Sequence, residues 1–167
     1  MKMTRTLLTL MLLPLVGTAS DSAILCVKTT GVDTNAGTSW AAPKKTISAA
    51  LTASAPGGQV WVAAGTYTQN VTLKVGVALY GGFAGTETNL TDRNPAINVS
   101  VIDGNKVDSA VIVPEGCTAS TVIDGFTIQN GAATYGGGIY CQNTSPLISG
   151  NTVKSNKAAY YGGGIYV

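Results

Sequence analysis

The sequence has no histidine and few charged residues of either sign. Charged side chains make up 11% of the 167 residues, and without histidine no site can use imidazole as a base or a metal ligand. Arg93 is the only arginine beyond the first five residues. No segment concentrates lysine or arginine, so neither nucleic acid nor an anionic membrane surface is expected as a partner.

A short apolar run near the N-terminus predicts a secretory signal peptide spanning residues 1–19. Lys2 and Arg5 precede the apolar run 7–16, and small residues follow it at 17–19. The run is about ten residues long, against the roughly 20 that a membrane-spanning helix needs, so we expect no transmembrane segment. The protein is therefore expected to be secreted, or to be located at the cell surface or outer membrane.

Removing the signal peptide makes the mature chain nearly neutral. Two of the ten basic residues leave with it while all eight acidic residues remain, which gives eight of each sign. Cys26, Cys117 and Cys141 also remain. Export would permit a disulfide between Cys117 and Cys141, but a spacing alone fixes no geometry, so free buried thiols are the favoured interpretation.

Glycine is abundant, with 21 residues, and it recurs within an internal repeat. The segments 123–125, 127–128 and 136–141 recur as 148–150, 152–153 and 162–167. The offset is 25 at the isoleucine that begins the repeat and 26 at the glycine triplet, which indicates one inserted residue. An earlier Ile-Asp-Gly at 102–104 lies 21 residues before Ile123. A fixed period of this size is typical of solenoid proteins.

Each repeat contains three short apolar runs separated by glycine or polar residues, which is typical of strands. If each repeat is one turn of a coil, equivalent strands stack about 4.8 Å apart in parallel sheets. We therefore predict an all-β fold, a right-handed parallel β-helix that forms a three-sheet solenoid.

The recurring residues have structural interpretations in such a coil. Ile139 and Ile165 are expected to form an inward ladder, and Tyr140 and Tyr166 to stack on the outside, where tyrosines can also contact sugars. Glycines at the bends would take positive φ or permit close backbone approach. These structural glycines are Gly81, Gly82, Gly136, Gly137, Gly138, Gly162, Gly163 and Gly164.

One segment has a helical pattern. Residues 45–55 place Ile47, Ala50, Leu51 and Ala55 on one face, and a Pro-Gly-Gly sequence follows. An amphipathic helix at this position would cover the open end of the first coil.

Strand signals continue upstream of the clear repeats, at 60–62, 71–75, 77–80, 99–102 and 110–113. We predict an N-terminal strand, loop and capping helix in residues 20–59 and coils in residues 60–167. Because Val167 falls inside a repeat that is still running, the chain is expected to be a C-terminally truncated fragment whose coils continue in a longer protein.

Several stretches resemble secreted, pectate-lyase-like right-handed β-helix proteins. They are residues 27–40, 46–51, 60–67 and 79–87. The Gly-Gly-Gly-Ile-Tyr repeats resemble those of polymorphic outer-membrane and autotransporter-like adhesins. The resemblance spans nearly the whole mature chain and implies the β-helix fold. The functions it implies are diverse, because such folds include polysaccharide lyases, glycoside hydrolases and adhesins.

Three side chains are candidates for catalysis. Arg93 could serve as the strong base of a lyase, although a structural pairing with Asp92 or a neighbouring carbonyl is the favoured interpretation. Asp103 and Asp124 could form the carboxylate pair of a hydrolase, about 5–9 Å apart, if they occupy equivalent places on adjacent coils. Both lie in Ile-Asp-Gly turns, and Ser149 replaces the acid in the next repeat, so hydrogen bonding within the turn is favoured.

Calcium is the one cofactor that the sequence suggests, and the signal is weak. It could bind between Asp103 and Asp124, or at Asp33 and Asn35 in the first loop. Neither fragment completes a known calcium-binding loop. The expectation is therefore a protein without a cofactor or metal.

Two functions stay open. The first is a noncatalytic extracellular or cell-surface scaffold, adhesin-like, that contacts carbohydrate or other cell-surface components. Neutral charge, the single arginine and acids explained by turns favour it. The alternative is the N-terminal part of a secreted polysaccharide lyase or glycoside hydrolase whose catalytic coils lie downstream.

Overall fold

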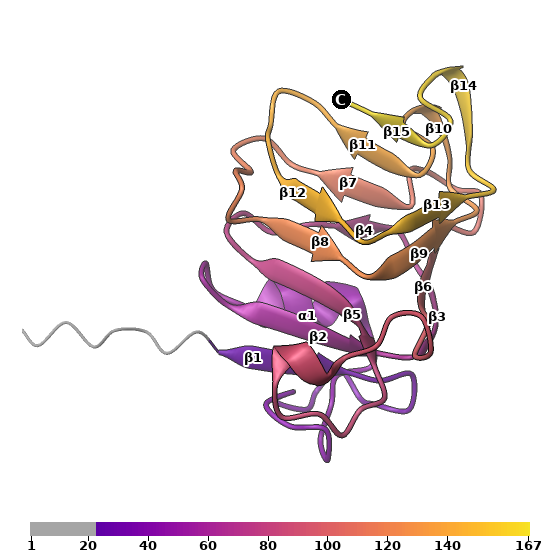
Figure 1. The fold of residues 1–167 in the computed structure, drawn as a ribbon. Helices are drawn as coiled ribbons and strands as arrows, with labels where there is room; N and C mark the ends of the chain where they lie inside the picture. Colours follow the sequence, from indigo (N-terminus) through magenta and orange to yellow (C-terminus); the bar gives the residue numbers. More distant parts are fainter. Residues whose placement is uncertain (1–22) are drawn as a thin grey trace, which may run out of the picture.

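The chain winds into a coil of stacked parallel strands (Figure 1). A computed structural model describes residues 23–167, so the predicted signal peptide at 1–19 lies outside the described residues. From β2 onward the chain visits three sheets in a fixed order, which we call sheets A, B and C, and each turn of the coil places a new strand beside the previous one. The predicted three-sheet parallel β-helix is confirmed.

The sheets are built from strands that lie far apart in sequence. Sheet A contains β1 (Ile24–Val27), β2 (Gln59–Ala63), β5 (Ala78–Phe83), β8 (Val122–Asp124) and β12 (Leu147–Ser149). Sheet B contains β3 (Gly65–Thr68), β6 (Ser100–Asp103), β9 (Phe126–Gln129) and β13 (Thr152–Lys154). Sheet C contains β4 (Val71–Thr72), β7 (Val111–Val113), β11 (Ile139–Cys141) and β15 (Ile165–Tyr166). A separate pair, β10 (Ala132–Tyr135) and β14 (Lys157–Tyr161), extends the last two coils between sheets B and C.

The core consists of aliphatic ladders that run along the coil axis. In sheet C, Val71, Val111, Ile139 and Ile165 are in register. The first three are fully buried, while Ile165, on the last coil, is 43% exposed. Sheets A and B contribute corresponding ladders, and burial of each such side chain stabilises the fold by roughly 1.5–3 kcal/mol. The predicted pairing of Ile139 with Ile165 is confirmed.

The predicted glycine bends are also present, and the members of a triplet have different roles. Gly136 and Gly162 have positive φ, 58° and 64°, at the bend that leads into sheet C. Gly137 does not need this conformation, but a Cβ on it would lie 2.2 Å from the carbonyl oxygen of Lys157 in the next coil. Close stacking of the coils therefore requires glycine at this position.

The two glycines of β5 serve a different contact. A Cβ on Gly81 would lie 2.7 Å from the Gly125 carbonyl oxygen, and one on Gly82 would lie 2.6 Å from Pro95. Gly82 also has a φ of 96°, beside a shift in the register between β2 and β5. Gly81 thus allows close stacking on the next coil, and Gly82 allows the loop after β5, which includes the short 3₁₀ helix η1 (Leu90–Asp92), to pack closely on sheet A.

Helix α1 (Ile47–Ala53) covers the first coil, as predicted. The Thr46 side chain caps it by accepting a hydrogen bond from the Ala49 N–H. Ile47, Ala50 and Leu51 are buried against β1, β2 and β4. The helix is shorter than the predicted span because residue 54 already has an extended backbone.

Candidate functional site

The two candidate catalytic acids belong to different sheets, which corrects the expectation that they are equivalent. Asp103 ends β6 in sheet B, where its register partner on the next coil is Gln129. Asp124 ends β8 in sheet A, where its partners are Tyr80 and Ser149. The Ile-Asp-Gly sequence at 102–104 is therefore not an earlier copy of 123–125, and the coil does not stack these acids as a hydrolase pair.

Asp103 is held by the turn that follows it, in agreement with the turn interpretation. One carboxylate oxygen accepts a hydrogen bond from the Asn105 N–H at 3.0 Å. The other accepts bonds from the side-chain amides of Gln129 at 3.0 Å and Asn130 at 2.7 Å. Burial alone would raise the pKa of Asp103, but these bonds and the nearby charge of Lys106 lower it below its ordinary value. The Asp103 carboxylate therefore serves as a hydrogen-bond acceptor within the coil.

The fall of stability in acid is expected to depend on Asp103. The pKa of Asp103 is lower in the folded state than in the unfolded state, so near these pKa values the folded state binds fewer protons. The stabilisation is therefore complete above the ordinary aspartate pKa, and it is lost as the pH falls through the lowered pKa of the folded state. We predict a melting temperature that is constant from pH 7 to about 5 and falls below about pH 4. Asp103→Asn should reduce the melting temperature at pH 7 and flatten the acid fall in thermal melts. An unchanged slope in this variant would contradict the prediction.

Arg93 and Asp124 form an ion pair on the outer face of sheet A. The Arg93 guanidinium also donates to the Gly81 carbonyl at 3.1 Å and lies 5.1 Å from the Tyr80 ring centre. Ser149 donates its hydroxyl to Asp124 at 2.5 Å. Of the two structural pairings expected for Arg93, the one with a backbone carbonyl is present and the acidic partner is Asp124 instead of Asp92. Asp124 is bound by Arg93 and Ser149 rather than by its own turn. This arrangement fastens the 84–99 loop to the coil.

The candidate calcium loop is organised by a buried lysine. The Lys44 ammonium donates to the backbone carbonyls of Asp33 at 3.0 Å and Asn35 at 2.8 Å, and the lysine is only 7% exposed. The Asp33 carboxylate accepts hydrogen bonds from the Lys45 and Thr46 backbone N–H groups. The lysine charge thus occupies the oxygen-rich centre of the loop. Within residues 23–167, no group of three or more acidic, cysteine or histidine residues could hold a metal.

The three cysteines are buried free thiols in the structure. Burial raises the pKa of Cys26 to about 11. Burial, together with the neighbouring Cys117, also raises the pKa of Cys141. Since the thiolate is the reactive form, these side chains act as small apolar residues of the core.

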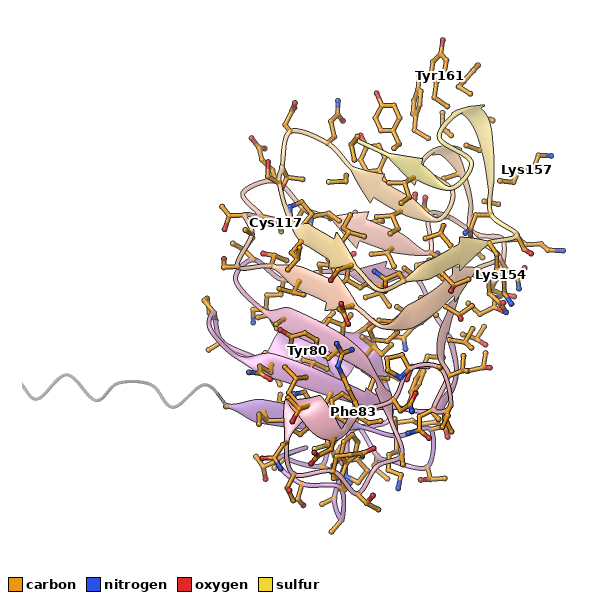
Figure 2. The ribbon with its side chains drawn as sticks, viewed as in Figure 1. Tyr80, Phe83, Cys117, Lys154, Lys157 and Tyr161 are labelled. Atoms are coloured by element: carbon orange, nitrogen blue, oxygen red, sulfur yellow. The ribbon has the colours of Figure 1, made fainter. Side chains whose placement is uncertain are left out.

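Five tyrosines gather beside sheet C on the last two coils. Tyr140 and Tyr166, in register on β11 and β15, stack with ring centres 5.7 Å apart and planes 3° from parallel, as predicted. Tyr135 lies 5.3–6.1 Å from the rings of Tyr160, Tyr161 and Tyr166. We call these five residues the tyrosine cluster. Figure 2 shows Tyr161 projecting beyond the last coil.

The inserted residue of the last repeat lies within this cluster. Ala133 pairs with Ala158, an offset of 25, but Tyr135 pairs with Tyr161, an offset of 26, so β14 bulges between them. Tyr160 lies in the bulge and is 71% exposed, and Tyr161 is 68% exposed. Bulges re-aim side chains and are enriched at functional positions. The insertion therefore adds an aromatic ring to the surface where the regular repeat has none.

A groove of about 290 Å³ lies next to the cluster. Tyr135 and Tyr140 form its aromatic wall, and Asp108 and Ser109 supply polar groups. Ile112, on β7, also lines it. Apolar rings combined with a few polar groups are typical of small-ligand sites. We call it the tyrosine groove.

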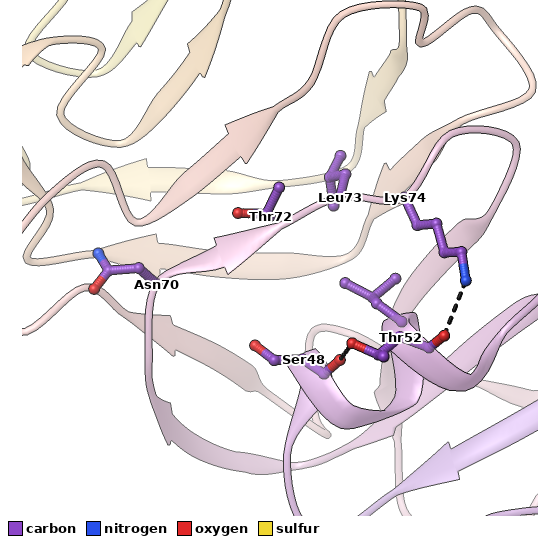
Figure 3. Close-up of a pocket in the computed structure, with 7 residues that line it drawn as sticks. Ser48, Thr52, Asn70, Thr72, Leu73 and Lys74 are labelled. Atoms are coloured by element: carbon purple, nitrogen blue, oxygen red, sulfur yellow. Dashed lines mark hydrogen bonds between the residues drawn. The ribbon is translucent and has the colours of Figure 1, made fainter.

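A second groove of about 460 Å³ lies toward the first coil, between α1 and β4 (Figure 3). Lys74 crosses its edge and donates to the Thr52 carbonyl at 2.9 Å. Asn70 connects the two grooves, because its side-chain amide donates to the Ser109 carbonyl at 2.8 Å. Thr72, Ile112 and Tyr140 are register partners along the same face. The outer face of sheet C is therefore hollowed along the coil axis.

The sequence interpretation missed Asp108, Tyr135, Tyr160 and Tyr161. The three tyrosines could have been found, since Ala-Ala-Thr-Tyr before one glycine triplet recurs as Ala-Ala-Tyr-Tyr before the next. The recurrence has an offset of 26 throughout, whereas the structure places the inserted residue inside it, between Ala158 and Tyr161. Asp108 has no such signal, since only folding brings it beside Tyr135.

These features define a three-sheet parallel β-helix with an aromatic groove on one face. The chain belongs to the family described as a protein of unknown function (DUF1565), whose model matches residues 29–165 and which is associated with β-helix repeat proteins. No curated protein and no solved structure matches the chain. Among the helices of residues 23–167, none is long and apolar enough to cross a membrane.

Proposed function

We propose that this chain is part of an exported, noncatalytic β-helix scaffold that contacts carbohydrate through the tyrosine cluster and groove. The observation that carries the proposal is the groove of about 290 Å³ that is walled by Tyr135 and Tyr140 and carries Asp108 and Ser109 as polar groups. A groove with aromatic walls and a few polar groups is the kind of surface at which a small ligand binds. Sugar rings present apolar C–H faces and hydroxyl groups, which match the two kinds of surface that tyrosine offers.

The state of the candidate catalytic residues supports a scaffold over an enzyme. Arg93 is engaged by Asp124 and the Gly81 carbonyl, so its donors are directed into the fold. Asp103 accepts three hydrogen bonds within the coil. A catalytic acid or base needs contact with a reacting proton, and these groups are already committed to structural partners.

Replacing the exposed tyrosines is expected to weaken carbohydrate binding. Tyr160→Ser and Tyr161→Ser remove ring faces worth about 1 kcal/mol each, so each dissociation constant should rise roughly fivefold to tenfold. Calorimetric titration of the purified chain with neutral oligosaccharides measures this effect. Both residues are exposed, so the melting temperature should change little.

The control is Tyr80→Phe on sheet A, which keeps the ring beneath Arg93 and lies away from the groove. It should bind as the unaltered chain does. Incubation with the same oligosaccharides, followed by chromatography, tests for cleavage. Release of shorter products, lost on mutating Arg93 or Asp124, would overturn the proposal in favour of a polysaccharide-degrading enzyme.

A further inference from the structure

The one ionisable acid in the tyrosine groove is Asp108, and part of its carboxylate is available. Asp108 is exposed and lines the groove with Ser109, Tyr135 and Tyr140. One oxygen accepts a hydrogen bond from the Ser109 N–H at 2.7 Å, which fixes the carboxylate at the groove wall. Within residues 23–167 no ion pair joins this carboxylate to a lysine or arginine.

No lysine or arginine lines the tyrosine groove. Lys157, on β14, is the basic residue nearest in sequence to the bulge. It pairs with Ala132, which is not among the residues that line the groove. Figure 2 shows Lys157 pointing sideways from the coil, unlike Tyr161.

The lysine of the neighbouring groove does not supply a positive charge either. The Lys74 ammonium is bound by the carbonyls of Thr52 and Ser54 at the end of α1. Its charge is therefore directed toward the helix end, where carbonyl oxygens carry partial negative charge. Among the residues that line the two grooves, the uncompensated charge is the negative one at Asp108.

We propose that the tyrosine groove selects neutral and amine-bearing sugars and disfavours uronates. This inference rests on the proposed function and names the ligand class of the same site. The tyrosine rings supply contact to sugar faces, and the fixed Asp108 carboxylate accepts hydrogen bonds from hydroxyl or ammonium groups. A uronate carboxylate would meet a like charge with no cation to offset it. At contact distance in water, one such charge changes affinity about fivefold in either direction.

The test compares three oligosaccharide probes of equal length, made of glucose, glucosamine or galacturonic acid. Calorimetric titration of the purified chain at low salt should give the tightest binding for the glucosamine oligomer and the weakest for the galacturonate. The two extremes should differ about 25-fold. The range should shrink as salt is added, because ions screen exposed charges.

Asp108→Asn is the decisive variant, because an asparagine oxygen can still accept the Ser109 N–H. It should bind the glucose oligomer within about twofold of the unaltered chain and bring the three affinities close together. Asp92→Asn is the control, because it changes the net charge by the same amount at an exposed residue of η1, which does not line the groove. It should leave the order of the three affinities unchanged.

The outcomes separate this inference from the proposed function. Tightest binding of galacturonate that still depends on Tyr161 would overturn the charge preference and leave carbohydrate binding standing. An order of affinities that Asp108→Asn does not change would also overturn the preference. Absence of binding by all three oligomers would overturn both.

Discussion

Gly137→Ala is expected to lower the free energy of unfolding by about 3 kcal/mol. The added Cβ would lie 2.2 Å from the Lys157 carbonyl oxygen of the next coil, a separation that no methyl group can occupy. The obstructing atom belongs to the backbone, so relief requires two coils to separate and weakens the hydrogen bonds between them. Chemical denaturation followed by circular dichroism measures the loss.

Gly163→Ala is the matched control, since Gly163 holds the same place one coil later. A Cβ there has no neighbour closer than 3.8 Å, so the change should stay within about 0.5 kcal/mol. The pair isolates the contact between coils from the general effect of replacing glycine. Equal losses in both variants would show that stacking of one coil on the next does not set the glycine requirement.

Lys44→Met is expected to cost about 3 kcal/mol of stability. Methionine keeps an apolar stem of similar length, but it removes two charge-assisted hydrogen bonds, to the carbonyls of Asp33 and Asn35. Those carbonyls then lose their partner inside a loop that packs against β1. Thermal and chemical denaturation should both report the loss.

Lys45→Met provides the comparison at the neighbouring residue. Lys45 is exposed, and the bond it makes to Asp33 uses its backbone N–H, which the substitution retains. Its stability should change by less than about 0.5 kcal/mol. If the two lysine variants lose equal stability, the buried ammonium is not what organises the loop.

The coil architecture was predictable because it depends on a periodic pattern. Ile139 and Ile165, and Tyr140 and Tyr166, recur at a fixed offset, and the stacking of parallel strands converts that offset into contact. The capping helix was predictable from apolar spacing around Ile47. The apolar spacing is local and the offset is strictly repeated, so both can be read from the sequence without knowledge of distant contacts.

The relation between Asp103 and Asp124 was not predictable from their shared Ile-Asp-Gly motif. Earlier coils are irregular, so a spacing of 21 residues places the same three letters on a different sheet. The pairing of Arg93 with Asp124 depends on how the 84–99 loop folds back over sheet A. Such a contact has no periodic signal in the sequence.

The tyrosine groove was predictable only in part. Stacking of Tyr140 and Tyr166 follows from the repeat, and sugar contact was one interpretation of these rings. The bulge that contains Tyr160 depends on which residue of β14 leaves the ladder, and an inserted residue alone does not specify that. Burial of Lys44 was likewise missed, because lysine is rarely buried unless polar groups surround it.

The most direct test of the carbohydrate-binding proposal is hydrogen–deuterium exchange of the purified chain with and without a saturating neutral oligosaccharide. Protection should rise in β7, β10 and β14, whose residues line or border the tyrosine groove, and stay unchanged around Arg93 and Asp124 on sheet A. Protection confined to sheet A, with none at the tyrosine groove, would contradict the account.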